Sequence, residues 1–99
     1  MAEVISKSEL MAKMTENLKV LRNKLNLTQD ELANKVGISR QTLVSIENKR
    51  RDMSWNTFVA LIAVFRAKSG TSALLDHFGI YTDDLSSYLV SRENANVDL

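Results

Sequence analysis

The segment 28–47 constrains the fold more than any other part of this chain of 99 residues. Thr28 and Glu31 have the spacing of a capping box, in which a threonine and a glutamate three residues later close the start of a helix. The next apolar residues recur at helical spacing: Leu32, Ala33 and Val36. Gly37 then supplies a residue that tolerates the left-handed conformation in which many helices end. The sequence therefore predicts a short helix followed by a tight turn.

A second short helix follows directly. Ser39 is placed to cap it, and Leu43 and Ile46 recur at the spacing of a buried stripe. Four residues would face outward on this helix: Arg40, Gln41, Val44 and Ser45. A short helix whose outer face bears a cation and an amide has the dimensions and the chemistry that fit the major groove of DNA.

The run LNLTQDELANKVGISRQTLVSIEN resembles the Cro/repressor (xenobiotic-response-element, XRE) family of helix-turn-helix DNA-binding domains over about residues 18–65. The shared pattern is Thr-Gln, then Glu-Leu-Ala, then Gly-hydrophobic-Ser, and later Ile-Glu-Asn. The resemblance implies an all-α, lambda-repressor-like domain of about five or six helices. Two departures stand out, because Lys49 replaces the family's usual glycine and the usual proline after it is absent. Since a positive φ is strained for lysine, we expect this loop to take a different path.

The resemblance also implies roles for individual residues. Base contacts are expected from Arg40, Gln41, Val44 and Ser45, and phosphate contacts from Gln29, Ser39, Thr42, Asn48, Lys49, Arg50 and Arg51. Alternatives remain open for each of these roles. Arg40 could neutralise a phosphate without reading a base, and Val44 could be covered by a partner or by the first helix. Ser45 could make no contact with DNA, and the cations 49–51 could simply be solvated. Glu47 is expected to brace the fold, with Arg22 as a candidate partner.

The rest of the chain also has helical periodicity, with no proline and only three glycines. A first helix is expected from Ser6 or Ser8 to Asn26, its early start making it longer than in the family. Two short helices, roughly 29–36 and 40–47, follow it. Ser54 would cap a fourth helix through Ala67. We expect a break at 69–70, a fifth helix from Thr71 or Ser72 to Gly79, a short sixth helix capped by Thr82, and a fraying tail from Ser91.

This pattern predicts a DNA-binding domain over 1–68 with its helix-turn-helix at 28–47, extra helices over 69–90, and a tail over 91–99. The extra helices carry apolar residues that four small helices hardly need. We expect a homodimer through Leu74, Leu75, Phe78, Tyr81, Leu85, Tyr88 and Leu89. The alternative is that these residues, together with Ile80, extend the core of the monomer.

The net charge is only +1, but its distribution is uneven. Residues 18–51 carry eight cations and three anions, whereas residues 52–99 carry three cations and six anions. This asymmetry favours a polyanion on one side of the molecule, although a solvated surface would give the same charges.

Cysteine is absent and His77 is the single histidine, which excludes disulfides and gives no metal-site signal. No apolar run suits a membrane span, no export signal is evident, and no nucleophile–base pair suggests an enzyme. We therefore expect a cytoplasmic protein without cofactors.

The leading hypothesis is a dimeric, sequence-specific transcriptional regulator, most simply a repressor that inserts helix 40–47 into a near-palindromic operator. The alternative hypothesis is an antitoxin, or another partner-regulated DNA-binding protein, whose C-terminal helices bind a second protein.

Overall fold

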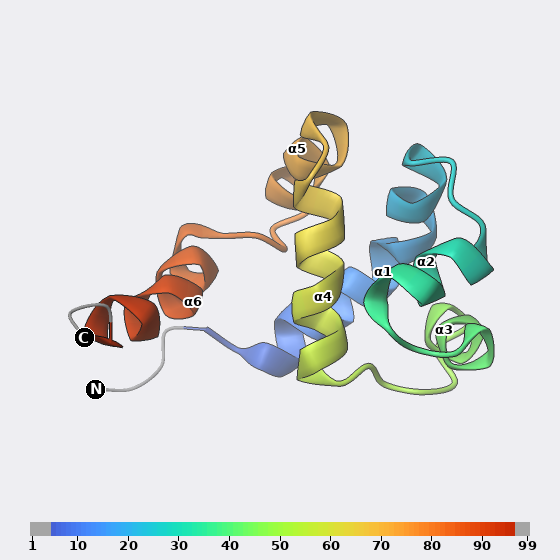
Figure 1. Cartoon of the computed structure of the whole chain (residues 1–99), viewed down its shortest axis with the longest axis horizontal. Coiled ribbons are helices and arrows are strands. Elements are labelled where there is room, and N and C mark those ends of the chain that lie inside the picture. The colour runs from blue at the N-terminus through green and yellow to red at the C-terminus, as the bar shows by residue number, and fades with distance from the viewer. Residues whose placement is uncertain (1–4, 97–99) are drawn as a thin grey trace.

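A computed structural model describes residues 5–96, with side chains described as far as residue 90. This part contains no strand and six helices: α1 (Lys7–Lys24), α2 (Gln29–Val36), α3 (Arg40–Glu47), α4 (Trp55–Arg66), α5 (Ser69–His77) and α6 (Asp83–Asn96). In Figure 1, α4 runs through the middle of the molecule, α2 and α3 lie on one side of it, and α6 lies on the other. The predicted all-α fold of five or six helices is confirmed.

The helix starts follow from side chains that replace the backbone partners missing in a first turn. An oxygen of the residue before the helix accepts the backbone N–H three residues later at Ser6, Thr28, Ser39 and Ser54. The capping box at Thr28 is complete, because its own N–H donates to Glu31 Oε1 at 2.8 Å. Gly37 ends α2 with φ +80°, as predicted.

A single apolar core receives residues from six helices of the described chain. Four residues of α1 and four apolar residues of α4 are buried at helical spacing: Leu10, Met14, Leu18, Leu21, Phe58, Leu61, Ile62 and Phe65. Ala33 of α2 is 1% exposed, and α2 packs closely against α3. A small side chain there lets the two helices approach each other. Leu43 and Ile46 lie on the inner face of α3 and are buried in the core, so the opposite face of α3 points away from the core.

The expected break at 69–70 is wrong, because these residues form the first turn of α5. The connection after α4 is instead very short. The Thr71 hydroxyl, expected near the start of the helix as a cap, is buried and donates to the carbonyl of Phe65. That bond satisfies one of the free carbonyl groups at the end of α4.

The sixth helix starts as predicted but is longer than expected. The Thr82 hydroxyl accepts the backbone N–H of Leu85 at 3.1 Å, and α6 continues to Asn96. The fraying tail predicted from Ser91 is therefore helical as far as Asn96, and the remainder of that prediction, residues 97–99, lies outside the described residues. The segment after Ser91 has no periodic apolar pattern, so the pattern alone did not predict it as helical.

Aromatic contacts join α6 to the rest of the molecule. The ring of Trp55 stacks on Phe58 with centroids 4.8 Å apart and meets Tyr88 edge-on at 6.3 Å. The ammonium of Lys7 lies 4.9 Å from the Trp55 ring centroid. Leu85 of α6 is fully buried in the core. These contacts hold α6 near the start of α1, at the end of the molecule opposite α2 and α3 (Figure 1).

Candidate nucleic-acid interface

The outer face of α3 gathers the residues that the sequence predicted for base contact. A shallow surface depression is lined by Arg40, Gln41, Thr42, Val44, Ser45 and Arg51. Arg40 and Gln41 are exposed, while Val44 and Ser45 are half-buried. The depression therefore contains all four residues expected to contact bases and two of those expected to contact phosphates. It offers a guanidinium, an amide, a methyl surface and hydroxyls, the groups that recognise base edges.

The start and the interior of α3 are held firmly. The Ser39 hydroxyl accepts the Thr42 backbone N–H at 3.0 Å and hydrogen bonds with the Thr42 hydroxyl at 2.9 Å. The Thr42 hydroxyl also receives a 3.4 Å hydrogen bond from Arg51. This bond brings the cationic loop after α3 back towards the start of the helix. The sequence pattern did not predict that contact.

A buried ion pair fixes α3 to α1. The Arg22 side chain donates through Nε to Glu47 Oε2 at 2.7 Å and through Nη2 to Glu47 Oε1 at 3.2 Å. The Glu47 side chain is fully buried, and the Arg22 side chain is 13% exposed. Arg22 also donates to the carbonyl of Leu27 at 3.0 Å, just before α2. The expected pairing of Glu47 with Arg22 is thus confirmed, in the bidentate geometry that makes such pairs strong.

Gln29 belongs to the same network. Gln29 is the first residue of α2. Its side-chain amide donates a hydrogen bond to Glu47 Oε1 at 3.0 Å, and this bond orients the side chain. One N–H of the amide and its oxygen remain for another partner. The sequence placed Gln29 as a phosphate contact without showing what orients it. Its spacing of eighteen residues from Glu47 carries no local signal, so this bond needed the fold.

The loop after α3 keeps the backbone path that glycine would take. Lys49 has φ +63°, in the left-handed region, so the expectation of a different path is wrong. The backbone N–H of Lys49 donates a hydrogen bond to the carbonyl of Ile46 at 3.0 Å. The backbone N–H of Arg50 donates one to the carbonyl of Ser45 at 2.9 Å. These bonds satisfy carbonyl groups at the end of the helix and outweigh the strain of the lysine.

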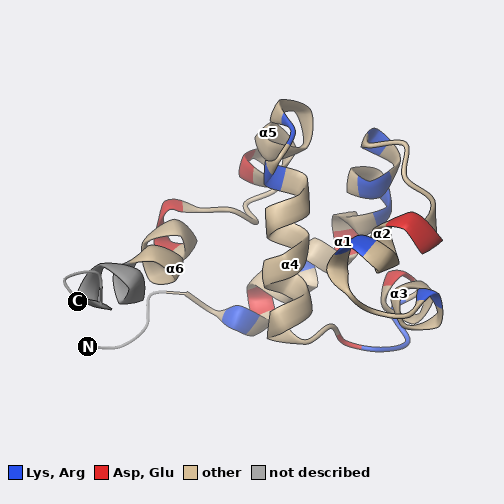
Figure 2. Cartoon of the chain, viewed as in Figure 1, with Lys and Arg blue, Asp and Glu red and all other residues tan. Residues whose placement is uncertain are grey.

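The cations of this loop have different surroundings. The ammonium of Lys49 lies 2.9 Å from Glu16 of α1, in a pair whose side chains are both exposed. Asn48 and Arg50 are exposed as well. Figure 2 shows basic residues along most of the loop after α3 and, separately, on the last turns of α1, and acidic residues at the start of α6. Residues 69–90 contain three aspartates and no lysine or arginine.

The residues predicted for dimerisation divide into two groups. Leu75 and Leu85 are fully buried within the monomer, so for these two, and for the fully buried Ile80, the alternative of a larger core applies. A closed core leaves them no surface for a partner. The others are partly exposed: Leu74, Phe78, Tyr81, Tyr88 and Leu89. Tyr81 is also covered by the guanidinium of Arg66, 4.2 Å from its ring centroid.

Other kinds of site find little support between residues 5 and 90. That part of the chain contains no group of three or more His, Cys, Asp or Glu side chains able to hold a metal ion. None of the described helices is both long and apolar enough to cross a membrane.

Comparison with known proteins agrees with this geometry. A helix-turn-helix family model matches residues 18–69, slightly more than half of the chain. An uncharacterized HTH-type transcriptional regulator of Methanocaldococcus jannaschii is 37% identical over 71 residues, which cover 72% of this chain and 98% of that protein. A second such regulator, from Archaeoglobus fulgidus, is 38% identical over 55 residues, or 56% and 78% of the two chains. No solved structure matches significantly. The chain therefore belongs to the XRE-type helix-turn-helix family of DNA-binding transcription regulators, which is not an enzyme family.

Proposed function

We propose that the protein is a dimeric repressor that inserts α3 into the major groove of a near-palindromic operator. The observation that carries this proposal is the depression on α3, where Arg40, Gln41, Val44 and Ser45 share one solvent-facing surface. Behind that surface, Leu43 and Ile46 are buried and Glu47 is paired. Rigidly held side chains on a helix suit base recognition, because their geometry is set before binding.

Each exposed group on this surface has a preferred base partner. The Arg40 guanidinium suits O6 and N7 of guanine, and the Gln41 amide suits adenine. The methyl groups of Val44 suit the methyl group of thymine, and Ser45 can accept or donate a hydrogen bond. These pairings give α3 a sequence preference.

Phosphates flank the groove on both sides of such a helix. At one end, Gln29 and the backbone N–H groups at the start of α2 can hold a phosphate. At the other, Asn48, Arg50 and Arg51 are exposed on the loop after α3. Ser39, Thr42 and Lys49 complete the proposed set. Such contacts orient the protein and make its affinity strongly dependent on salt.

Dimerisation follows from the size of the recognition surface. An α3 of eight residues covers one half-site, and two copies would cover half-sites about 34–36 Å apart. The partly exposed apolar residues of 74–89 support an interface there. A dimer bound to an operator would block the access of RNA polymerase to the DNA there. The simplest outcome is therefore repression, and we place the protein in the cytoplasm.

The first test is a selection of bound duplexes from a random DNA pool, followed by anisotropy titrations with the enriched duplex. We expect a preferred half-site sequence and an affinity that falls steeply with salt. Arg40→Ala should lose about 1–3 kcal/mol of discrimination at one base pair. The matched control is Lys13→Ala, because Lys13 of α1 lies close to Gly79 and does not line the depression on α3. Binding without sequence preference would contradict the proposal.

Sedimentation tests the dimer. Phe78→Glu places a charge among the partly exposed apolar residues, so it should give a monomer whose operator affinity falls roughly 100-fold, through loss of bivalent binding. Ser87→Glu changes an exposed residue of α6 and serves as control. A wild-type protein that is monomeric both free and on DNA would exclude the dimer. Copurification of a stoichiometric partner protein would favour the antitoxin hypothesis instead.

A further inference from the structure

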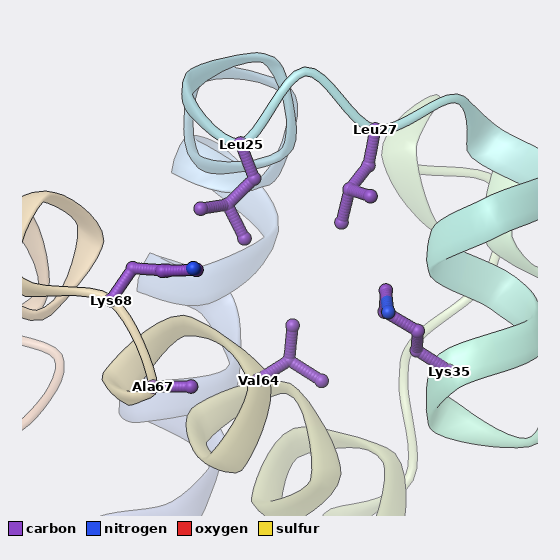
Figure 3. Close-up of a pocket in the computed structure, with 6 residues that line it drawn as sticks. All are labelled: Leu25, Leu27, Lys35, Val64, Ala67 and Lys68. Atoms are coloured by element: carbon purple, nitrogen blue, oxygen red, sulfur yellow. The ribbon is translucent and has the colours of Figure 1, made fainter.

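A second pocket lies apart from the surface of α3. It has a volume of about 490 Å³ and is lined by Leu25, Leu27, Lys35, Val64, Ala67 and Lys68. These residues come from the turn after α1, from the last turn of α2, and from the end of α4 with the residues after it. The six lining side chains converge on one space in Figure 3. None of them belongs to the depression on α3, so this pocket is separate from the proposed DNA interface.

The floor of this pocket is apolar. Leu25 and Leu27 point into it from one side, and Val64 of α4 and Ala67, which directly follows α4, face them (Figure 3). The two leucines and Val64 are only partly buried and rest against the core, so a bound apolar group would gain free energy by covering them. The volume of the pocket lies within the range found for pockets that hold small molecules, about 300–1,000 Å³.

Two cations face the same space. Figure 3 shows the Lys35 and Lys68 side chains entering from opposite sides, each with its nitrogen towards the pocket. No acidic residue lines the pocket. Within the part of the chain whose side chains are described, neither lysine takes part in a salt bridge. Two unpaired ammonium groups over an apolar floor give a positive potential that favours an anion.

The backbone adds to this potential. Lys68 is the N-cap residue of α5, and no side chain caps this helix. An uncapped helix start carries partial positive charge. Lys24 also lies near that start, since an added Cβ on Gly70 would be 3.3 Å from Lys24 Cε. The region around the pocket therefore holds three lysines and a helix start.

We infer that this pocket binds a small organic monoanion, a carboxylate joined to an apolar body such as a medium aliphatic chain. Both ammonium groups, of Lys35 and Lys68, would attract the carboxylate, and the apolar body would cover Leu25, Leu27 and Val64. A protein partner fits less well, because stable interfaces cover about 800 Å² on each side, and six residues around a concave site do not supply that area. Duplex DNA keeps its bases stacked inside the helix, so it offers no free apolar body to fill the floor.

The test is a titration of the full chain with decanoate, below the concentration at which it forms micelles, observed by amide chemical shifts in NMR. We expect saturable shifts centred on residues 25–27, 35 and 64–68. Decylamine, with the same chain and the opposite charge, should bind at least tenfold more weakly. Acetate, which lacks the apolar body, should give no saturable shifts. Since no DNA is present, the result is independent of the proposed operator binding.

Variants locate the site. Lys35→Gln and Lys68→Gln should each weaken decanoate binding roughly fivefold, as expected for one partly exposed ion pair. Ala67→Trp should abolish it by filling the pocket, while its amide spectrum verifies that the fold is intact. Lys13→Gln removes a cation remote from the pocket and should change nothing. Equal binding of decanoate and decylamine, shifts centred elsewhere, or an equal effect of Lys13→Gln would overturn the inference.

Discussion

The two halves of this molecule bury their side chains by different means. Up to α4, buried residues follow the periodicity of capped helices, and an ion pair between the largely buried Arg22 and the fully buried Glu47 connects α1 to α3. From α5 onwards, residues of similar chemistry have different fates. Leu75, Ile80 and Leu85 are fully buried, whereas Leu74, Phe78 and Leu89 remain partly exposed. In the first half, a local sequence pattern and a polar network determine which side chains are buried. In the second half, burial depends on where each segment packs against the rest of the molecule.

The largest expected effect concerns the polar network of the first half. Arg22→Met keeps the length of the side chain but leaves the carboxylate of Glu47 buried without its cation. Removing one partner of a buried pair costs about 3–5 kcal/mol of unfolding free energy. Equilibrium urea denaturation measures this cost.

The exposed pair between Lys49 and Glu16 supplies the control. Both of its side chains are more than half exposed, so Lys49→Met should cost less than about 1 kcal/mol. The two pairs connect α1 to neighbouring residues near the end of α3, and they differ mainly in burial. Similar costs for the two variants would show that burial does not separate these pairs.

The second prediction asks whether the two halves unfold together. Leu85 of α6 is fully buried, and its replacement by alanine should cost about 2–4 kcal/mol. Trp55, the single tryptophan, contacts Tyr88 of α6, so its fluorescence reports on the junction. We expect fluorescence and far-UV circular dichroism to give one coincident transition, as in a two-state domain.

Val90→Ala is the matched control, since Val90 is 41% exposed and its truncation should change stability by less than about 0.5 kcal/mol. If α6 unfolds first, Leu85→Ala would shift the fluorescence transition and leave most of the dichroism transition in place. That result would make the second half a docked appendage rather than part of one cooperative unit.

The sequence predicted more of the first half than of the second for a physical reason. Helices α2 and α3 were predicted with their observed bounds, because Thr28, Gly37 and Ser39 act on groups only a few residues away. The start of α5 was predicted wrongly because Thr71 acts across the connection, on the Phe65 carbonyl. Local signals describe local bonds well, whereas contacts across a connection depend on the tertiary arrangement.

The same limit applies to the sites. The residues on the surface of α3 share one short helix, so their common face follows from helical spacing. Gln29 and Glu47 are brought together only by folding. The apolar pocket combines residues 25–27, 35 and 64–68, and no spacing along the chain connects these three segments. Sites of this kind need coordinates.

The smallest expected effect concerns Lys49, where the first half itself departs from its family. A non-glycine residue at φ +63° is strained by roughly 1 kcal/mol relative to glycine. Lys49→Gly and Lys49→Ala both remove the exposed pair with Glu16, but only glycine removes the strain. The glycine variant should therefore be more stable than the alanine variant by about 1 kcal/mol, measured by the midpoint of urea unfolding. Equal midpoints would mean that the loop adjusts its backbone to alanine without loss of stability. The local sequence pattern would then constrain the backbone of the first half less tightly than its capped helices suggest.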